Sequence, residues 1–268
     1  MDISSLIGIS LGVLAILAGR IMESHSIMGL VALMQFQAFV IVIGGTVGAM
    51  ILGSRKQDVL NIPKLFSIAF TEVQLKPELI IPQIVKYAEK ARREGLLSLE
   101  KEVATVDDLF LKQGLQLVAD GTDPDIVKAI MEIELSQQEE RHVQGSNMLD
   151  QAGAFAPTVG IIGAVLGLIY VMENLAEGTE RIGAGIATAF VATIYGLVFA
   201  NIFLHPMANK LRMKSKEEKL VREMILEGIL SIQAGDNPRI IEEKLKAFIS
   251  AAHRAQYEAI KEAAKRGG

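Results

Sequence analysis

The sequence contains no cysteine and no tryptophan. Without cysteine, the chain has no disulfide framework, no thiolate zinc site and no cysteine nucleophile. Without tryptophan, an aromatic belt at a membrane surface must be formed by Tyr and Phe. The formal net charge of −4 over 268 residues is small and evenly spread, which excludes the basic surface that nucleic-acid binding requires.

Common enzyme motifs are also missing. The chain has no G-x-S-x-G, no H-E-x-x-H, no phosphate loop ending in Gly-Lys-Ser/Thr, and no G-x-G-x-x-G after a strand. The histidines occur in four different segments, at His25, His142, His205 and His253. We therefore expect no enzymatic activity, no cofactor and no resident metal.

Charge is missing from long stretches of the chain. Residues 151–172 and 182–209 contain no Asp, Glu, Lys or Arg, and a short polar connector, 173–181, separates them. Two earlier uncharged runs cover residues 3–19 and 27–53. A helix needs about 20 apolar residues to cross a bilayer, so the sequence predicts an all-α membrane protein with four transmembrane helices.

Small residues form a stripe along each of the last two predicted spans. Steps of three and four residues place each stripe on one helix face, and such a face lets another helix approach backbone to backbone in lipid. Packing within one bundle is one interpretation, and the presence of two stripes favours an intersubunit or pore-like seam instead. The stripes consist of Gly153, Ala156, Gly160, Gly163 and Gly167, and of Gly185, Ala189, Ala192, Gly196 and Ala200.

No acidic or basic side chain lies within these two spans, although membrane proteins that move ions usually have one at depth. If this chain carries ions, the titrating carboxylate must come from another chain. If it carries none, the chain is a scaffold. The polar side chains at depth are those of Thr158, Tyr170, Thr188, Thr193, Tyr195 and Asn201.

Several basic residues follow the second span, beginning with Arg55, and the fourth span, beginning with Lys210. By contrast, the Lys and Arg residues of the two short connectors are Arg20 and Arg181 alone. The positive-inside rule then places the large charged regions and both termini in the cytoplasm. Four domains follow: residues 1–53 with two spans, 54–150 as a cytoplasmic helical domain, 151–209 with two spans, and 210–268 as cytoplasmic helices.

Helical spacing, turns and caps organise the charged regions. Gly95 is expected to interrupt one helix, and Asp123-Pro124 and Asn237-Pro238 are typical helix starts. The helix after Asp123 is expected to continue into the third span as one rod. Pro157 and Pro206 lie at the cytoplasmic ends of the paired spans, where a proline permits a kink and so favours a hinge.

The chain resembles the MotA/PomA family, the larger subunits of the bacterial flagellar stator. The resemblance covers almost the whole length, and it rests on several motifs taken together. These are Ala156-Pro157 with Gly160 and Gly163, Thr193-Ile194-Tyr195-Gly196, His205-Pro206-x-Ala208-x-Lys210-Leu211, the ARREGLLSLE stretch, and residues 139–145.

This resemblance implies an inner-membrane complex in which five copies surround a dimer of a MotB-like subunit. That partner supplies a membrane aspartate and is anchored to peptidoglycan, while cytoplasmic heads push on the rotor protein FliG. The rotor-facing charges of the family match Arg92, Arg93 and Glu100 here. The prolines of the conformational step match Pro157 and Pro206.

The ion path of the family matches Thr193, and we place Ala164, Ala192 and Tyr195 beside it. Sodium-type relatives have threonines where this chain has Ala164 and Ala192. Because sodium needs oxygen ligands and a proton needs only a titratable group and water, these alanines favour protons. A sodium-driven stator, an ExbB/TolQ-like energiser of outer-membrane processes and a membrane scaffold are the alternatives.

Overall fold

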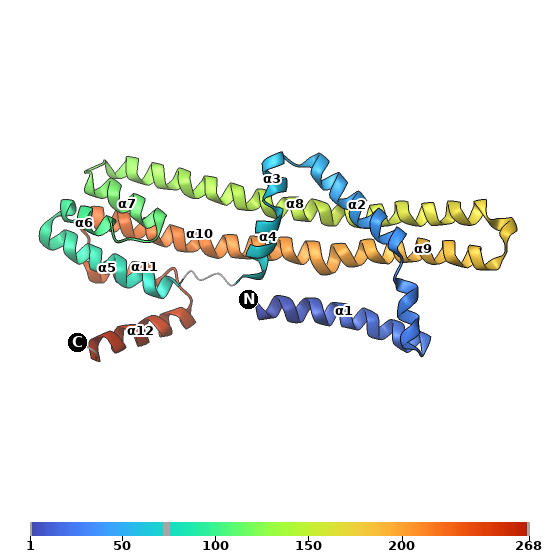
Figure 1. The fold of residues 1–268 in the computed structure, drawn as a ribbon. Coiled ribbons are helices and arrows are strands. Elements are labelled where there is room, and N and C mark those ends of the chain that lie inside the picture. The colour runs from blue at the N-terminus through green and yellow to red at the C-terminus, as the bar shows by residue number, and fades with distance from the viewer. Residues whose placement is uncertain (1, 72–75, 267–268) are drawn as a thin grey trace. The chain divides into compact units, whose positions relative to one another are not determined.

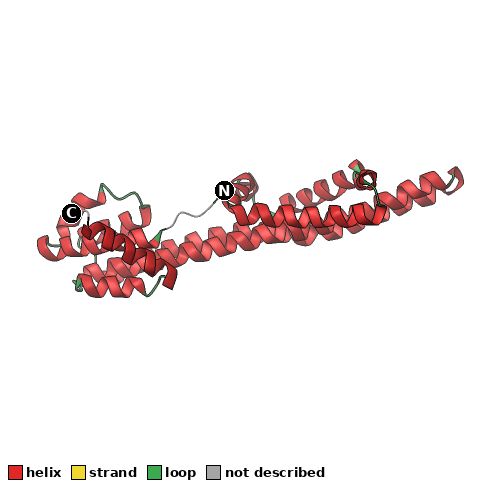
Figure 2. Ribbon diagram, turned by 90° about the horizontal axis from the view of Figure 1, so that it is seen from below, coloured by secondary structure: helices red, strands yellow, loops and turns green. Residues whose placement is uncertain are grey.

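A computed structural model describes residues 2–71 and 76–266. The remaining residues, 1, 72–75, 267 and 268, lie outside the described part, and they include the first residue of the first predicted domain and the last two residues of the last one. Every regular element in the described part is a helix (Figure 2), which confirms the all-α prediction. The elements are α1 (Ile3–Ser24), η1 (Ile27–Leu33), α2 (Phe36–Gly53), α3 (Lys56–Leu60), α4 (Ile62–Phe70), α5 (Pro77–Glu94), η2 (Leu96–Leu99), α6 (Glu100–Val103), α7 (Leu109–Ala119), α8 (Pro124–Glu173), η3 (Leu175–Glu177), α9 (Thr179–Val198), η4 (Phe199–Leu204), α10 (His205–Gln233), α11 (Pro238–Lys246) and α12 (Ala251–Arg266).

The chain divides into two compact units. Residues 1–72 and 142–213 form one, which we call the membrane unit, and residues 73–141 and 214–268 form the other, which we call the polar unit. The structure thus groups residues 54–71 and 142–150 with the apolar helices, whereas the domain prediction placed them in the cytoplasmic domain. The reason is packing, because Gly145 of α8 closely approaches Leu65 of α4.

Within the described residues, four helices are long and apolar enough to cross a membrane, as predicted: α1, α2, α8, and the continuous helix that begins with α9. The 50-residue helix α8 is the expected single rod. At its start, the Asp123 carboxylate accepts a hydrogen bond from the Asp125 N–H at 2.9 Å. That bond satisfies one of the free N–H groups of the first turn.

The second predicted span is shorter than its uncharged run. Residues 27–53 were expected to form one segment, but the structure divides them into η1 and α2 with an extended Gln35 between them. The Leu33 carbonyl accepts hydrogen bonds from the Gln35 N–H and the Tyr195 hydroxyl, which replace a continuing helical bond. The uncharged run was therefore a poor guide to where this helix begins.

The two small-residue stripes pack against each other within one chain, where α8 and α9 lie side by side (Figure 1). A Cβ added at Gly196 would lie 2.5 Å from the Ala156 carbonyl oxygen, and one at Gly160 would lie 2.9 Å from the Ala192 carbonyl oxygen. The favoured interpretation, an intersubunit or pore-like seam, is therefore wrong for these faces. We call this contact the α8–α9 seam.

The polar unit has its own hydrophobic core, formed by α5 to α7, the first part of α8, the later part of α10, and α11 and α12. Arg222 of α10 pairs with Asp108 at 2.6 Å and lies over the Phe110 ring, 5.4 Å from its centroid. Near the C-terminus, the side chain of Glu242 is largely buried. Burial raises the pKa of Glu242, but hydrogen bonds from Lys261, Tyr257 and Lys246 outweigh it and hold that pKa below its ordinary value.

The close approach at Gly196 leads to a stability prediction. We expect Gly196→Val to destabilise the protein by about 1–3 kcal/mol, because its methyl groups must displace the backbone of α8 at Ala156. The thermal unfolding midpoint of the purified protein in detergent should fall by several degrees. Gly183→Val is the matched control on α9, since an added Cβ there meets nothing within 4 Å. Equal midpoints for the two variants would contradict the tight seam.

Candidate functional site

The residues predicted for the ion path lie at and beside the α8–α9 seam. Ala192 is fully buried, and a Cβ added at Gly163 would lie 2.7 Å from its methyl group. Its neighbour Thr193 is half-buried and donates its hydroxyl to the Ala189 carbonyl at 3.2 Å. Ala164 is half-buried on α8, next to Gly163. Three of the four predicted residues thus lie on adjoining turns of the two seam helices.

Tyr195 lies one turn after Ala192 on α9 and packs against the buried cluster that contains it. Its hydroxyl donates to the Leu33 carbonyl at the end of η1, so its polar atom is used to hold α9 against the approach to α2. Thr188, which directly precedes the seam residue Ala189, has its hydroxyl within hydrogen-bond distance of the Ala184 carbonyl of its own helix and of Gln35 Oε1. The structure therefore gives the Tyr195 hydroxyl a contact with the chain that leads into α2.

The two prolines have different local environments. Helix α8 continues through Pro157. By contrast, the π-helix η4 (Phe199–Leu204) lies directly before Pro206. Proline lacks an N–H and its ring clashes with the carbonyl four residues earlier, here that of Ile202. The wider π-turn places that carbonyl in a different geometry, and π-turns often mark functional sites.

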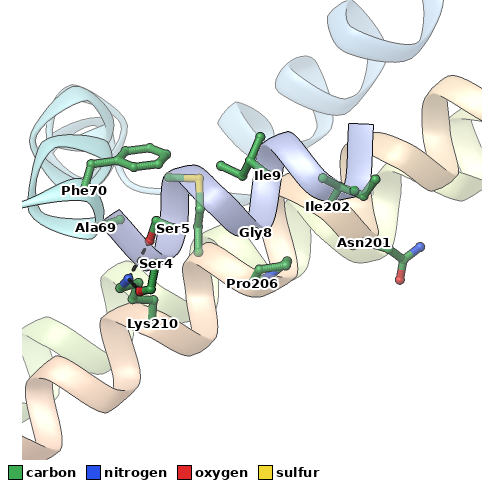
Figure 3. A pocket seen from close by; sticks show the side chains of 12 residues that line it. Ser4, Ser5, Gly8, Ile9, Ala69, Phe70, Asn201, Ile202, Pro206 and Lys210 are labelled. Carbon is green, nitrogen blue, oxygen red and sulfur yellow. Dashed lines mark hydrogen bonds between the residues drawn. The ribbon is translucent and has the colours of Figure 1, made fainter. Parts of the chain in front are cut away.

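A cavity of about 370 Å³ lies beside this turn (Figure 3). Its walls come from α1, from the end of α4 at Phe70, and from the chain around Pro206 and Lys210. At its edge, the Lys210 ammonium pairs with the Asp2 carboxylate and donates to the Ser5 hydroxyl. Pro206 therefore borders free volume on one side, and the end of α1 is fastened to α10.

Sequence reasoning missed a cluster of charged groups that joins α8 to α10. His205 Nδ1 lies 2.8 Å from one carboxylate oxygen of Asp150, and Arg212 donates to the other at 2.8 Å. Arg212 also donates to Asn147 at 3.0 Å. The signal in the sequence was that Asp150 directly precedes the first of these uncharged runs and that His205 lies near the end of the second, but the two are 55 residues apart.

Comparisons with known proteins agree with this architecture. The sequence model of the MotA/TolQ/ExbB proton channel family matches residues 102–224. Motility protein A of Bacillus subtilis is 40% identical over 96% of this chain and 94% of its own length. The chain belongs to the MotA family.

Other MotA-family comparisons extend over the same length. Chemotaxis protein PomA of Vibrio alginolyticus is 30% identical over 95% of this chain and 98% of its own. A solved chain of the flagellar MotAB stator complex from Bacillus subtilis is 39% identical, with a TM-score of 0.87 over 96% of this chain and 99% of that one. A chain of C. jejuni MotAB gives the same TM-score at 30% identity, over 94% and 97%. The resemblance inferred from the motifs is confirmed.

The charges assigned to rotor contact in this MotA-family chain flank one turn of the polar unit. Arg92 and Arg93 end α5, Gly95 follows with φ of +84°, and Glu100 begins α6. All three charged residues are exposed, and Arg93 pairs with Glu89 at 3.3 Å. The conformation of Gly95, which favours glycine, places the two segments around this turn.

A neighbouring ion pair holds the same turn together. Lys90 of α5 lies 2.6 Å from Glu102 of α6. The hydrogen bond between them raises the pKa of Lys90 and lowers the pKa of Glu102. Both groups are therefore charged at neutral pH, and the pair joins the two elements that carry the predicted rotor residues.

The Tyr195 contact can be separated from ion conduction. We expect Tyr195→Phe to lower the free energy of unfolding by about 1 kcal/mol, because the variant loses one partly buried hydrogen bond to the Leu33 carbonyl. The measurement is thermal or denaturant unfolding in detergent. Tyr170→Phe, at an exposed position on α8, is the control. A stable Tyr195→Phe variant with altered ion dependence of motility would instead place the hydroxyl in the ion path.

Proposed function

We propose that this chain is the ion-channel and torque-generating subunit of a flagellar motor stator, which couples ion flow across the inner membrane to flagellar rotation. The observation that carries this conclusion is a pair of tightly packed spans without a charged residue, in a chain similar over its full length to MotA chains of stator complexes. The chain is a multi-pass protein with four apolar helices. No enzymatic step is part of this function.

The absence of an acidic side chain from the paired spans indicates that a partner subunit supplies one. Ion passage through lipid needs a titratable or coordinating group at depth, and the spans formed by α8, α9 and η4 provide hydroxyls, the Asn201 amide and backbone there. A MotB-like, peptidoglycan-anchored subunit would supply a membrane aspartate, and the two solved relatives are MotAB complexes. We propose five copies of this chain around a dimer of that subunit. The exposed apolar side chains on α8, such as Ile161, Val165 and Leu168, offer surface for lipid and for these neighbours.

Protons are the proposed coupling ion. The matching family model describes proton channels. Ala192 offers no oxygen and is enclosed by the seam, and the Thr193 hydroxyl is already directed to the Ala189 carbonyl. A sodium ion needs several oxygen ligands in exchange for its water, so loss of hydroxyls at Ala164 and Ala192 favours a proton. Sodium is the second candidate because Thr193 keeps its oxygen beside the seam.

The rotor contact is proposed for the exposed charges Arg92, Arg93 and Glu100, with FliG as the partner. The left-handed conformation of Gly95 and the Lys90–Glu102 pair hold together the two segments that carry these exposed charges. Both termini and the polar unit would lie in the cytoplasm, as the basic residues after α2 and in α10 indicate. In this arrangement Pro157 of α8 and Pro206 of α10 lie near the cytoplasmic ends of the third and fourth spans, where conformational coupling is proposed.

Two alternative functions, an energiser of outer-membrane processes and a membrane scaffold, predict different relatives or a different ion dependence. An ExbB/TolQ-like energiser is not favoured, because relatives matched over the full chain are motility and chemotaxis proteins. A scaffold without ion flow would leave motility independent of any ion gradient. Ion dependence therefore separates a stator subunit from a scaffold.

The coupling ion is tested in cells that use this chain and its partner as the only stator. We expect swimming speed to ignore sodium at fixed pH and to collapse on addition of a protonophore. Speed that follows sodium and survives the protonophore would contradict proton coupling and favour a sodium site at Thr193 and the partner. Swimming that ignores both treatments would contradict an ion-driven stator.

The rotor contact is tested by charge reversal. Arg92→Glu and Glu100→Lys are expected to reduce swimming speed while the complex remains in the membrane, because a like charge now faces the rotor. A reversal that costs about 1.4 kcal/mol weakens docking tenfold. Arg239→Glu, at an exposed position of the same unit, is the control and should swim normally. Normal torque in both reversals and in their combination would exclude the assigned role.

A further inference from the structure

The Asp150–His205 contact lies where the charge-free spans end. Between residues 151 and 204, the acidic, basic and imidazole side chains all fall in the connector 173–181. At the opposite end, the first such groups are Asp150 on α8 and His205 on α10, joined by a 2.8 Å hydrogen bond. Along α8 and the helix that begins with α9, this pair therefore contains the first acidic and imidazole groups at this end of the spans.

The geometry fixes which imidazole atom exchanges protons. His205 Nδ1 faces the Asp150 carboxylate, so Nδ1 carries a proton and Nε2 is the nitrogen that gains and loses one. The side chain remains 37% exposed, which gives water access to the ring. An ordinary imidazole titrates near neutral pH, so it can accept and release a proton under cellular conditions.

Gly153 makes room for this ring. A Cβ at Gly153 would lie 2.7 Å from His205 Cε1 and 2.9 Å from both ring nitrogens. The imidazole therefore lies directly against the backbone of α8, three residues after Asp150. Together with the carboxylate, this contact holds the ring in one orientation.

The charges around His205 come from three neighbouring elements. On α10, Arg212 occupies the second Asp150 oxygen at 2.8 Å, and Lys210 is directed to Asp2 beside α1. Arg55 and Asp58 line a hollow with Asn147 and Gln151, on the flank of α8 next to Asp150. On α4, the ionisable residue is Lys64, which is exposed.

These charges leave His205 with one close anion and one nearby cation. Asp150 stabilises the protonated ring, and Arg212 on the far oxygen of the same carboxylate opposes that effect. With Asp150 and Arg212 balanced, protonation of the ring changes the net charge of the group from zero to +1.

We propose that His205, oriented by Asp150, is the proton acceptor at the cytoplasmic end of the ion path. A proton released from the carboxylic acid of the partner passes through water to Nε2, where an N–H bond forms as the O–H bond of the donating water breaks. The imidazolium then gives that proton to cytoplasmic water. This inference rests on the proposed proton-driven function, and Asp150 acts as a positioning residue.

The test measures motor speed against cytoplasmic pH at constant proton-motive force, with the complete stator complex in cells. In the unmodified protein, speed should fall as the cytoplasm is acidified into the range in which an ordinary imidazole becomes protonated. His205→Gln keeps a donor for Asp150 but cannot titrate, so speed at pH 7.5 should fall at least about threefold and lose its dependence on pH. His253→Gln, the same change at an exposed position on α12, should behave as the unmodified protein.

Asp150→Asn provides a second measurement. It keeps an oxygen for the ring but removes the charge that favours the imidazolium, so the midpoint of the pH profile should move to lower pH. Immunoblots of the membrane fraction separate these effects from loss of protein. If His205→Gln does not accumulate, the midpoint of Asp150→Asn decides, and an unchanged midpoint overturns the proposal.

The remaining outcomes distinguish the inference from the function on which it rests. A protonophore-sensitive motor with an unchanged speed and pH profile in His205→Gln overturns the role of His205 and leaves proton coupling intact. An equal loss in His253→Gln also overturns it. A motor that runs on sodium overturns both proposals.

Discussion

The backbone contact between α8 and α9 is the interaction on which the membrane unit depends. Lipid tails are as apolar as leucine, so no hydrophobic force drives two spans together, and close van der Waals packing must do so. Gly160, Gly167 and Gly196 allow that packing by leaving carbonyl and Cα atoms of the facing helix in contact. Because larger or charged side chains cannot enter this contact, the titratable groups of these helices lie at its ends, among them Asp150 and His205.

The sequence was sufficient to predict much of the fold. The four spans follow from the absence of charge, and the helix starts at Asp123 and Asn237 follow from side chains that cap free N–H groups. The partner of each glycine stripe could not be predicted, because periodicity identifies a face and carries no information about what covers it. The same limit applies to Asp150 and His205, which only tertiary packing brings together.

Local distortions of the helices could not be predicted from the sequence either. The break at Gln35 depends on a hydrogen bond from Tyr195, 162 residues away from Leu33, so no local pattern contains it. Pro206 indicated an irregular helix but did not specify a π-turn before it. The roles of Arg92, Arg93 and Glu100 came from family resemblance alone, since an exposed charge on a helix has no signature that separates docking from solvation.

The π-turn at Phe199–Leu204 also sets which charges meet in the membrane unit. It contains one residue more than an α-helical turn, so every later residue is shifted by one position, about 100° around the axis. With this phase, Lys210 reaches Asp2 while Arg212 reaches Asp150. Deleting one residue within the turn would leave hydropathy and composition almost untouched, yet would rotate both cations away from their carboxylates. The number of residues in this turn therefore matters more for the two ion pairs than which residues they are.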